Sequence, residues 1–264
     1  MLRSDPPPRP AVPDGERYYV IGDIHGRLDL YDALIDAIER EDSRRSPATT
    51  QIVLLGDLVD RGADSAGVLA RTREWQRHRT VRVLAGNHED MFLASFERPE
   101  ALRHFLKHGG RETILSFGLD KRDFNNLGLD ELFDLLPRLV PQSEREYIAA
   151  FEDSITAGDY LFVHAGVDPQ RPLTDQKRTD LLWIRDRFLS YEGPLDKVVV
   201  HGHTIFDGVV DRGNRIGIDT GAFRSGVLTA LTLEGTERRI IQAEMREDGE
   251  IAISHDAFGS RTDR

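Results

Sequence analysis

A short apolar run that leads straight into a charged, glycine-bounded loop limits this chain to few folds. Ile52-Val53-Leu54-Leu55 is aliphatic and partly β-branched, which predicts a buried strand of a parallel sheet. It is followed by Gly56-Asp57-Leu58-Val59-Asp60-Arg61-Gly62. Because open α/β sheets bind ligands at the carboxyl ends of their strands, this loop is a candidate functional site. Taken alone, a capped, charged turn explains the loop equally well.

The same arrangement occurs on either side of this loop. Arg17 to Ile21 predicts a strand that ends in Gly22-Asp23-Ile24-His25-Gly26, and Leu28 to Arg40 has helical spacing of apolar residues. Val81 to Leu84 predicts a third strand, which ends in Ala85-Gly86-Asn87-His88-Glu89. Strands that alternate with helices indicate βαβ units and a parallel sheet.

Further along, the pattern changes twice. Pro99 to about Ile155 is helical in spacing and predicts a helical insertion or cap. Tyr160 to Val163 and Val198 to Val200 predict strands that end in His164-Ala165-Gly166 and His201-Gly202-His203-Thr204. The rest predicts short strands at hairpin spacing: Val209-Val210, Arg215 to Ile218, Val227 to Leu233, Arg238 to Ala243 and Ile251 to Ser254.

The composition limits the kinds of metal site and binding partner that this chain can have. The chain has 264 residues and no cysteine, so any metal has to be held by nitrogen and oxygen. A net charge of −11 argues against binding to nucleic acid or to an anionic membrane, but leaves a phosphorylated substrate open. We expect a disordered proline-rich arm at 1–16, one domain at 17–258 and a disordered tail at 259–264. No signal peptide is recognised, and a cytoplasmic monomer is favoured.

The predicted strand ends carry carboxylates, an amide and imidazoles, which together suit manganese, iron or zinc. In an extended segment residues i and i+2 project to the same side, so Asp23 and His25 can face one ion. There are too many candidate ligands for one ion, and a two-metal site is usual for phosphate esters. Histidines away from strand ends are interpreted as surface or packing residues: His78, His104, His108 and His255.

The order of these five motifs resembles the calcineurin-like metallophosphoesterases of the phosphoprotein phosphatase family, above all their small bacterial and bacteriophage members. The resemblance covers about Tyr18 to Leu233. It implies an α/β fold, an αββα sandwich of two mixed sheets flanked by helices, with a dinuclear metal site at the strand ends. It also implies that the β-rich tail supplies much of the second sheet.

The resemblance implies a role for each metal ligand. Asp23 and His25 hold the first of two divalent ions, with manganese the first choice and iron or zinc as alternatives. Asp57 bridges both ions. The second ion is completed by Asn87, His164 and His203. His201 is interpreted as a supporting residue rather than a ligand, because the family's ligand directly precedes the threonine.

The resemblance also implies the catalytic groups. His88 is the general acid and Asp60 orients its imidazole. The phosphoryl oxygens are bound by Arg61, Asn87 and Arg185, while a metal-activated hydroxide attacks phosphorus in line. Two neighbouring residues are interpreted as structural: Trp183 as a core residue, and Glu89 as an acidic residue that suits a helix start.

The sequence favours a serine/threonine protein phosphatase, with phosphotyrosine as a further option. The alternative is a diadenosine tetraphosphatase. That relative tends to have alanine at the position of Asp60 and cysteine after the first motif, where this chain has Arg27. A phosphopeptide-binding protein without activity is a third hypothesis. It is disfavoured because no expected ligand is missing.

Overall fold

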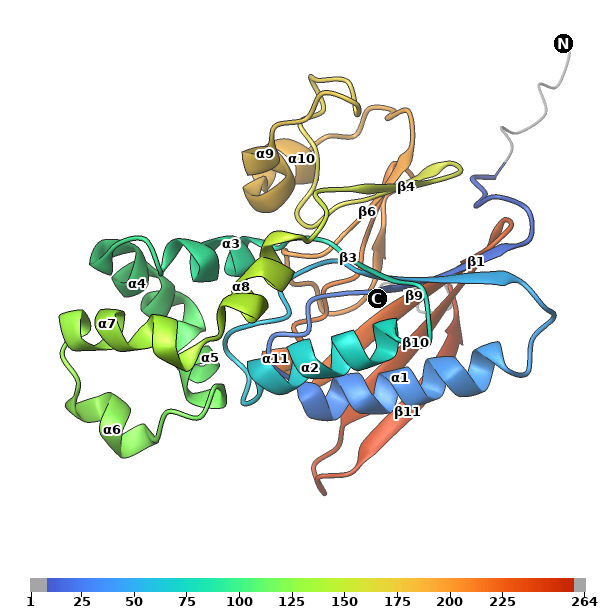
Figure 1. Ribbon diagram of the computed structural model, residues 1–264. Helices are drawn as coiled ribbons and strands as arrows, with labels where there is room; N and C mark the ends of the chain where they lie inside the picture. Colours follow the sequence, from blue (N-terminus) through green and yellow to red (C-terminus); the bar gives the residue numbers. More distant parts are fainter. Residues whose placement is uncertain (1–8, 259–264) are drawn as a thin grey trace, which may run out of the picture.

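The computed structural model describes residues 9–258, and its first sheet has six strands in the order β11-β10-β9-β1-β2-β3 (Figure 1). The strands β1, β2 and β3 are parallel, as predicted, and β9 joins β1 antiparallel. The bounds are β1 (Glu16–Ile21), β2 (Thr49–Leu54), β3 (Val81–Val83), β9 (Val227–Glu234), β10 (Glu237–Met245) and β11 (Ile251–Ala257).

The second sheet has five strands in the order β4-β5-β6-β8-β7, with β5, β6 and β8 parallel. The prediction that the β-rich tail supplies much of this sheet is wrong for its three longest strands. β9 pairs with β1 instead, with Val20 opposite Leu231. The bounds are β4 (Ile155–Ala157), β5 (Tyr160–Phe162), β6 (Val198–His201), β7 (Val210–Asp211) and β8 (Arg215–Gly217).

Helices cover the outer faces of both sheets (Figure 1). The first sheet carries α1 (Leu28–Asp42) and α2 (Ser65–Gln76), and the second carries α9 (Arg178–Trp183) and α10 (Asp186–Leu189). The Asp64 carboxylate caps the start of α2, because it accepts the N–H of Gly67. Two more helices flank the site, α3 (Asn87–Ala94) and α11 (Ala222–Ser225).

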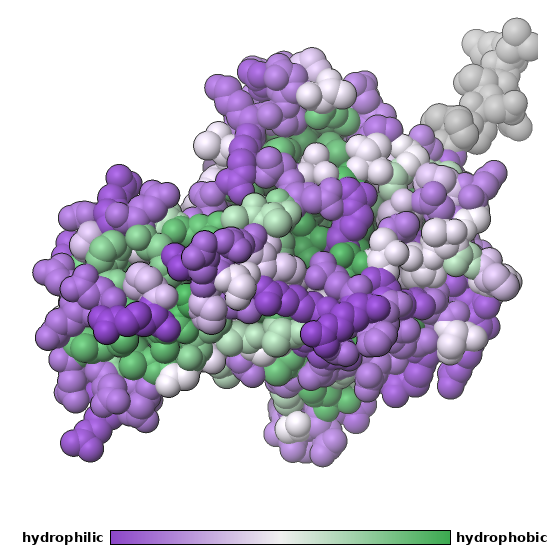
Figure 2. Space-filling model, in the orientation of Figure 1, coloured by the Kyte–Doolittle hydropathy of each residue, from purple (hydrophilic) through white to green (hydrophobic). Residues whose placement is uncertain are grey.

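The stretch predicted to be helical forms a group of short helices at one end of the molecule (Figure 1). A π-helical turn, η1, interrupts it, with Gly109 at φ +107°. The elements are α4 (Pro99–Phe105), η1 (Leu106–Gly110), α5 (Arg111–Ser116), α6 (Lys121–Asn126), α7 (Leu129–Leu139) and α8 (Gln142–Ala149). On the face shown in Figure 2 hydrophilic residues dominate, and apolar ones gather mainly over this helical end.

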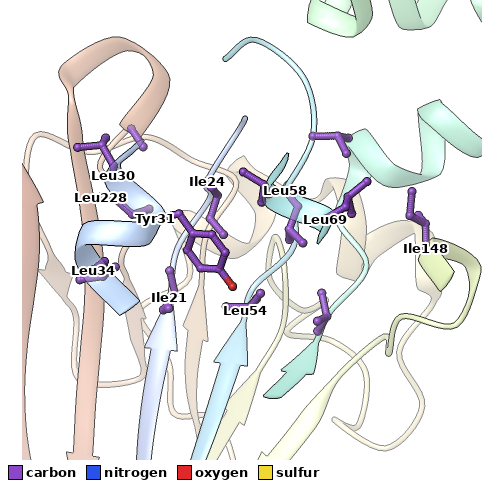
Figure 3. Packing of buried hydrophobic residues seen from close by; sticks show 14 of the residues in the cluster. Ile21, Ile24, Leu30, Tyr31, Leu34, Leu54, Leu58, Leu69, Ile148 and Leu228 are labelled. Atoms are coloured by element: carbon purple, nitrogen blue, oxygen red, sulfur yellow. The ribbon is translucent and has the colours of Figure 1, made fainter. Parts of the chain in front are cut away.

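Three apolar clusters produce the layers. Because side chains alternate along a strand, β1 sends Tyr19 and Ile21 toward α1 and sends Tyr18 and Val20 toward the second sheet. Figure 3 shows Ile21 and Leu54 on neighbouring strands with Tyr31 and Leu34 of α1 beside them. A third cluster packs α9 and α10 on the far face of the second sheet. The helix–sheet–sheet–helix sandwich is therefore confirmed.

Part of the predicted N-terminal arm is packed against the sandwich. Val12 is buried, its N–H donates to the carbonyl of Gly235, and the N–H of Ala11 donates to Asp159. The expectation of disorder is therefore wrong for these residues, whereas residues 1–8 and the tail at 259–264 lie outside the described part. Within residues 9–258, no helix has both the length and the apolar character needed to cross a membrane.

Candidate metal centre

The loops that follow β1, β2, β3, β5 and β6 meet at one edge of the sandwich. Parallel strands end on the same side of a sheet, so their first loop residues converge there. Both sheets contribute, because β1 to β3 belong to the first and β5 and β6 to the second. The predicted residues at this edge are each at most 7% exposed: Asp23, His25, Asp57, Asp60, Asn87, His88, His164 and His203.

Asp57 lies between two groups of metal-ligating side chains. One group is His25, Asp57 and His88, the other is Asp57, His164 and His203, and within each the ligating atoms lie within 4.8 Å of one another. Oδ2 of Asp57 is 3.5 Å from Nε2 of His25, and Oδ1 is 3.5 Å from Nε2 of His164. Each oxygen of one carboxylate thus faces a different group, which is the geometry that a bridging ligand needs.

Two further predicted ligands lie beside these groups. Oδ1 of Asn87 is 2.9 Å from Nε2 of His164 and 2.7 Å from Nδ1 of His203, so it completes the second group. Asp23 belongs to neither group, and its carboxylate accepts the backbone N–H of His203 at 3.1 Å. Asp23 also lies beside Asp219, a buried carboxylate that the sequence motifs did not single out.

Backbone carbonyls orient two of the imidazoles. Nδ1 of His25 donates to the carbonyl of Val59 at 2.7 Å, and Nδ1 of His164 donates to the carbonyl of Leu55 at 2.8 Å. A neutral imidazole that donates through Nδ1 keeps its lone pair on Nε2. Both Nε2 atoms therefore carry a lone pair and lie 3.5 Å from an oxygen of Asp57, and an outer hydrogen bond of this kind is typical of metal-bound histidine.

The buried groups fit a divalent cation. Nε2 of His164 and Oδ1 of Asn87 are both acceptors at 2.9 Å, and two lone pairs at that distance repel unless a cation lies between them. Burial, together with the charges of Asp219 and Asp57, raises the pKa of Asp23 well above its ordinary value. A cation would relieve both penalties, and imidazole, amide and carboxylate donors suit manganese, iron or zinc.

The protonation states also suit ligation. Burial lowers the pKa of His25 to about 3, and burial together with His164 lowers that of His203 to about 2, so both imidazoles are neutral. Burial alone would raise the pKa of Asp57, but the imidazoles of His164 and His88 outweigh it and hold that pKa below its usual range. A neutral imidazole and an ionised carboxylate are the forms that bind metal.

Backbone strain is concentrated at this site. In the described chain, the non-glycine residues with positive φ are His25 (47°), Asp57 (50°), Asp60 (73°), Arg61 (70°) and His203 (62°). All five are predicted site residues, and such conformations cost about 1–3 kcal/mol each. The backbone of Gly86 also packs directly against the carboxylate of Asp57, because a Cβ on Gly86 would lie 2.1 Å from Oδ1 of Asp57. The surrounding fold therefore holds these side chains in place against local preference.

A chain of hydrogen bonds orients His88. Nδ1 of His88 donates to Oδ2 of Asp60 at 2.6 Å, and the hydroxyl of Thr113 donates to Oδ1 of Asp60 at 2.6 Å. Burial would lower the pKa of His88, but the charges of Asp57 and Asp60 outweigh it and raise the pKa. Thr113 belongs to α5, so the helical end of the molecule contributes to the site, which no sequence motif indicated.

Two arginines lie at the open side of the centre. Arg61 donates to Nε2 of His25 and to Nε2 of His88, both at 2.8 Å. The side chain of Arg185 is exposed, and its charge contributes to lowering the pKa values of His164 and His203. Arg61 thus contacts the candidate ligands directly, whereas the contact of Arg185 is with the hydroxyl of Thr204 at 3.4 Å, next to His203. A planar guanidinium can bind phosphoryl oxygens.

Glu89 has a more specific contact than the predicted helix-start effect. Its buried carboxylate accepts the N–H groups of Gly86 and Asp57 through Oε2, and those of Leu58 and Val59 through Oε1. The structural interpretation of Glu89 is thus confirmed, but its main contact is with the loop that carries Asp57. Burial and the nearby charge of Asp57 raise the pKa of Glu89 to about 7. In the sequence, the only sign of this contact was the acidic residue directly after Asn87-His88.

We expect Glu89→Gln to lower the free energy of unfolding by about 2–5 kcal/mol, because an amide NH₂ would face two buried N–H donors. Urea unfolding at pH 8 measures this change. Glu131→Gln is the matched control, since Glu131 accepts the N–H of Gly128 at the exposed start of α7. Equal losses in the two variants would contradict the role given to Glu89.

Other predictions need correction or addition. Trp183 is not a core residue: it is 40% exposed, and its ring lies 6.2 Å from that of His203. It lines a hollow of about 490 Å³ with Met91 and His104. His201 is buried between Phe188 and Phe206 and belongs to neither metal-ligating group. The four histidines interpreted as surface or packing residues are all exposed: His78, His104, His108 and His255.

Comparison with known proteins identifies the family. Residues 16–226 match the calcineurin-like phosphoesterases. This chain belongs to the calcineurin-like phosphoesterase family. Solved structures agree in fold: a crystal structure assigned provisionally to a diadenosine tetraphosphatase has a TM-score of 0.58 at 19% identity and covers 96% of this chain and 100% of its own. A cold-active protein-tyrosine phosphatase of a Shewanella species has a TM-score of 0.52 at 16% identity, over 92% and 83%.

Curated relatives of this phosphoesterase carry two kinds of name. Serine/threonine-protein phosphatase 2 of Escherichia coli is 28% identical over 222 residues, which are 80% of this chain and 90% of the relative. The symmetrical bis(5'-nucleosyl)-tetraphosphatase of an Acidovorax species is 27% identical over 274 aligned residues, 83% and 94% of the two chains. The chain is therefore a hydrolase of phosphoesters, and the two names leave its substrate class open.

Divalent metal is expected to stabilise this phosphoesterase. Adding Mn²⁺ at about 100 times its Kd to chelator-treated protein should contribute about 2.7 kcal/mol, which raises Tm by about 5–10 °C in a chain of this size. Thermal unfolding with and without Mn²⁺ measures the shift. The shift should be much smaller in Asp57→Asn, and an equal shift in both proteins would mean that the metal binds elsewhere.

Proposed function

We propose that this phosphoesterase is a metal-dependent phosphomonoesterase that acts on phosphoserine and phosphothreonine of proteins, with phosphotyrosine as a further substrate. The observation that carries the proposal is the hydrogen bond of 2.6 Å between His88 and Asp60. A serine or threonine alkoxide is a poor leaving group and needs a proton as the P–O bond breaks, whereas a nucleotide phosphate leaves without one. A carboxylate that raises the pKa of His88 is therefore most useful on a phosphomonoester.

Two divalent ions, with manganese the first choice, would be held by residues of this chain. Asp23, His25 and Asp57 would hold the first ion. The second ion would be held by Asp57, Asn87, His164 and His203. When bound, such ions polarise a phosphoryl oxygen and lower the pKa of water to near neutrality.

The chain's own side chains would do the rest. Arg61 and Arg185 bind the phosphoryl oxygens and stabilise the negative charge that grows on them, and the amide of Asn87 adds a contact. In its cationic form, which its raised pKa favours, His88 donates the proton of Nε2 to the leaving oxygen while Asp60 holds the imidazole through Nδ1. No covalent phosphoenzyme is expected, because hydroxide derived from water attacks phosphorus directly.

The alternative substrate is a dinucleotide tetraphosphate, and the names of several curated relatives favour it. Against it stand Asp60 and Arg27, at positions where such relatives tend to have alanine and cysteine. We further propose that nucleic acid and membranes are not partners, because a net charge of −11 disfavours binding to either. A monomer in the cytoplasm completes the proposal.

A side-by-side assay tests the substrate. Chelator-treated, manganese-reloaded protein is given a phosphothreonine peptide and diadenosine tetraphosphate, and kcat/KM is measured for each. Faster hydrolysis of the peptide is the expected result. Faster cleavage of the dinucleotide would keep the metal centre but overturn the substrate class. Activity on neither, with two ions bound per chain, would support a phosphopeptide-binding protein instead.

A further inference from the structure

Arg61 contacts four distant parts of the chain. Its backbone is in the left-handed region, at φ 70°, and its N–H donates to the carbonyl of Gly109 at 3.1 Å. Its guanidinium donates to Nε2 of both His25 and His88, but these nitrogens are proposed to bind a metal and to carry a proton, so in the metal-loaded enzyme Gly109 and Phe223 remain to hold Arg61. A free arginine side chain has many rotamers, and ordering it on a substrate costs about 2 kcal/mol. An arginine ordered in advance avoids most of that cost.

The aromatic ring of Phe223 forms one of these contacts. The carbon Cζ of Arg61 lies 4.6 Å from the centroid of this ring, within the range of a cation–π interaction. The same ring meets His25 edge-on, with centroids 5.3 Å apart and an interplanar angle of 84°. Among the described residues, Phe223 belongs to none of the three apolar clusters of the fold. Its ring therefore packs against Arg61 and His25 of the metal centre rather than within an apolar cluster of the fold.

The short helix α11 presents Phe223 in a fixed position. Gly221 and Gly226 flank it with φ of 70° and 74°, and both are in the left-handed region that favours glycine. The guanidinium of Arg27 donates to the carbonyl of Ala222 at 2.8 Å and ties α11 to the loop after β1. The ring position is thus determined by the backbone on both sides.

The turn η1 forms the contact on the backbone side. Gly109 has φ +107°, and a Cβ there would lie 2.7 Å from Cγ and 2.9 Å from the backbone nitrogen of Arg61. Only glycine permits this approach. Single π-helical turns occur frequently at functional sites, and this one packs directly on the residue proposed to bind phosphate.

We propose that Phe223 and Gly109 are positioning residues, which together hold Arg61 in the orientation that binds the phosphoryl group. The inference rests on the proposed function, because it is there that Arg61 binds the phosphoryl oxygens. The carbon Cζ of Arg61 lies over the ring of Phe223, and the guanidinium N–H groups are directed at the imidazoles of the centre. The loop after β8 and the helical end of the molecule thereby determine the affinity of this phosphoesterase for the phosphoryl group.

Phe223→Leu tests the inference, because leucine keeps an apolar side chain and removes the ring. With manganese-loaded protein, KM for a phosphothreonine peptide, the inhibition constant of inorganic phosphate and its calorimetric Kd should all rise by about three- to thirty-fold. Phe223→Tyr keeps the ring and should restore values within about two-fold. Phe124→Leu is the matched control, since Arg111 stands over Phe124 at 5.3 Å in the helical end.

A double-mutant cycle with Arg61→Ala decides whether Phe223 acts through Arg61. In the Arg61→Ala background Phe223→Leu should have no further effect on KM or on phosphate binding. The same factor in both backgrounds would overturn the inference and leave the proposed function intact. If Arg61→Ala itself left phosphate binding unchanged, the role of Arg61 in the proposed function would be wrong.

Gly109→Ala tests the second contact in the same assays and should weaken phosphate binding in the same direction. Thermal unfolding accompanies each variant. A loss of binding by Phe223→Leu with Tm within about 2 °C of the wild type, which is below 1 kcal/mol in a chain of this size, indicates positioning. Weaker binding that follows only a fall in Tm or in bound metal would mean that Phe223 merely supports the fold, and would refute the inference.

Discussion

Asp57→Asn is expected to lower kcat on a phosphopeptide by about 10³-fold or more, because it weakens both metal sites at once. Asp57 is the only side chain that belongs to both metal-ligating groups of the described chain. Asparagine keeps the shape of the carboxylate but loses its charge and one of its acceptor oxygens. Metal content by elemental analysis and kcat at saturating Mn²⁺ measure the two effects.

Asp64→Asn is the matched control for this variant. Asp64 lies in the same loop region and caps α2, and asparagine caps a helix as well as aspartate does. The control should keep its metal and its activity. Asp57→Asn with two tightly bound ions per chain and more than about a tenth of the activity would be incompatible with a bridging role.

His88→Asn is expected to slow hydrolysis most for substrates with poor leaving groups. Loss of a general acid costs about 10²–10⁴-fold, so hydrolysis of a phosphoserine peptide should fall by that factor. The hydrolysis of p-nitrophenyl phosphate should fall much less, since nitrophenolate leaves without a proton. Rates for a series of aryl and alkyl phosphates, plotted against the pKa of the leaving alcohol, measure the difference.

Metal content separates this role from ligation. His88 shares a group with His25 and Asp57, and its Nε2 is 3.9 Å from Oδ2 of Asp57. If His88 is the acid, the variant keeps its ions and its rates become steeply dependent on the leaving group. Loss of an ion, with equal rate losses for all leaving groups, would make His88 a ligand. Asp60→Asn should show the same dependence in weaker form.

These two variants also bear on the substrate class. Asp60, His88 and Thr113 form one hydrogen-bonded chain, and the fold orders it in buried surroundings. Ordering buried polar groups in this way costs free energy, and a role in proton delivery accounts for that cost. A phosphoesterase that cleaved only phosphoanhydrides would gain little from it. A strong leaving-group dependence would therefore support a phosphomonoester substrate independently of the substrate assay.

The first half of the fold followed from local pattern. The continuous apolar run from Ile52 to Leu55 predicted a strand buried on both faces, and in the neighbouring β1 Tyr18 and Tyr19 indeed face different clusters. Once those strands are parallel, their ends must meet, so Asp23, Asp57 and Asn87 converge without any further information. The local pattern did not predict which of the two sheets the tail would join. Hairpin spacing shows that β9, β10 and β11 pair with one another, but it does not say which sheet they extend.

The part of the site that the sequence missed consists of residues without a motif. Thr113, Phe223 and Gly109 are ordinary residues in their own segments, which are the helix α5, the short helix α11 and the π-helical turn η1. Their contacts with Asp60 and Arg61 join positions tens of residues apart or more. Trp183 was misread for the same reason, because an aromatic residue in an apolar run is usually buried, and only the neighbouring chain decides its exposure.

The sequence by itself determined the chemical inventory of this phosphoesterase: which carboxylates, imidazoles and arginines stand at strand ends, and therefore which metals and reactions suit them. These follow from short-range rules, since a strand's side-chain alternation and the turn after it are fixed within a few residues. Only the tertiary structure decided how those groups are held. Glu89 fixes the Asp57 loop, Thr113 orients Asp60, and Phe223 lies against Arg61, because packing brings distant segments together in ways that no local pattern encodes.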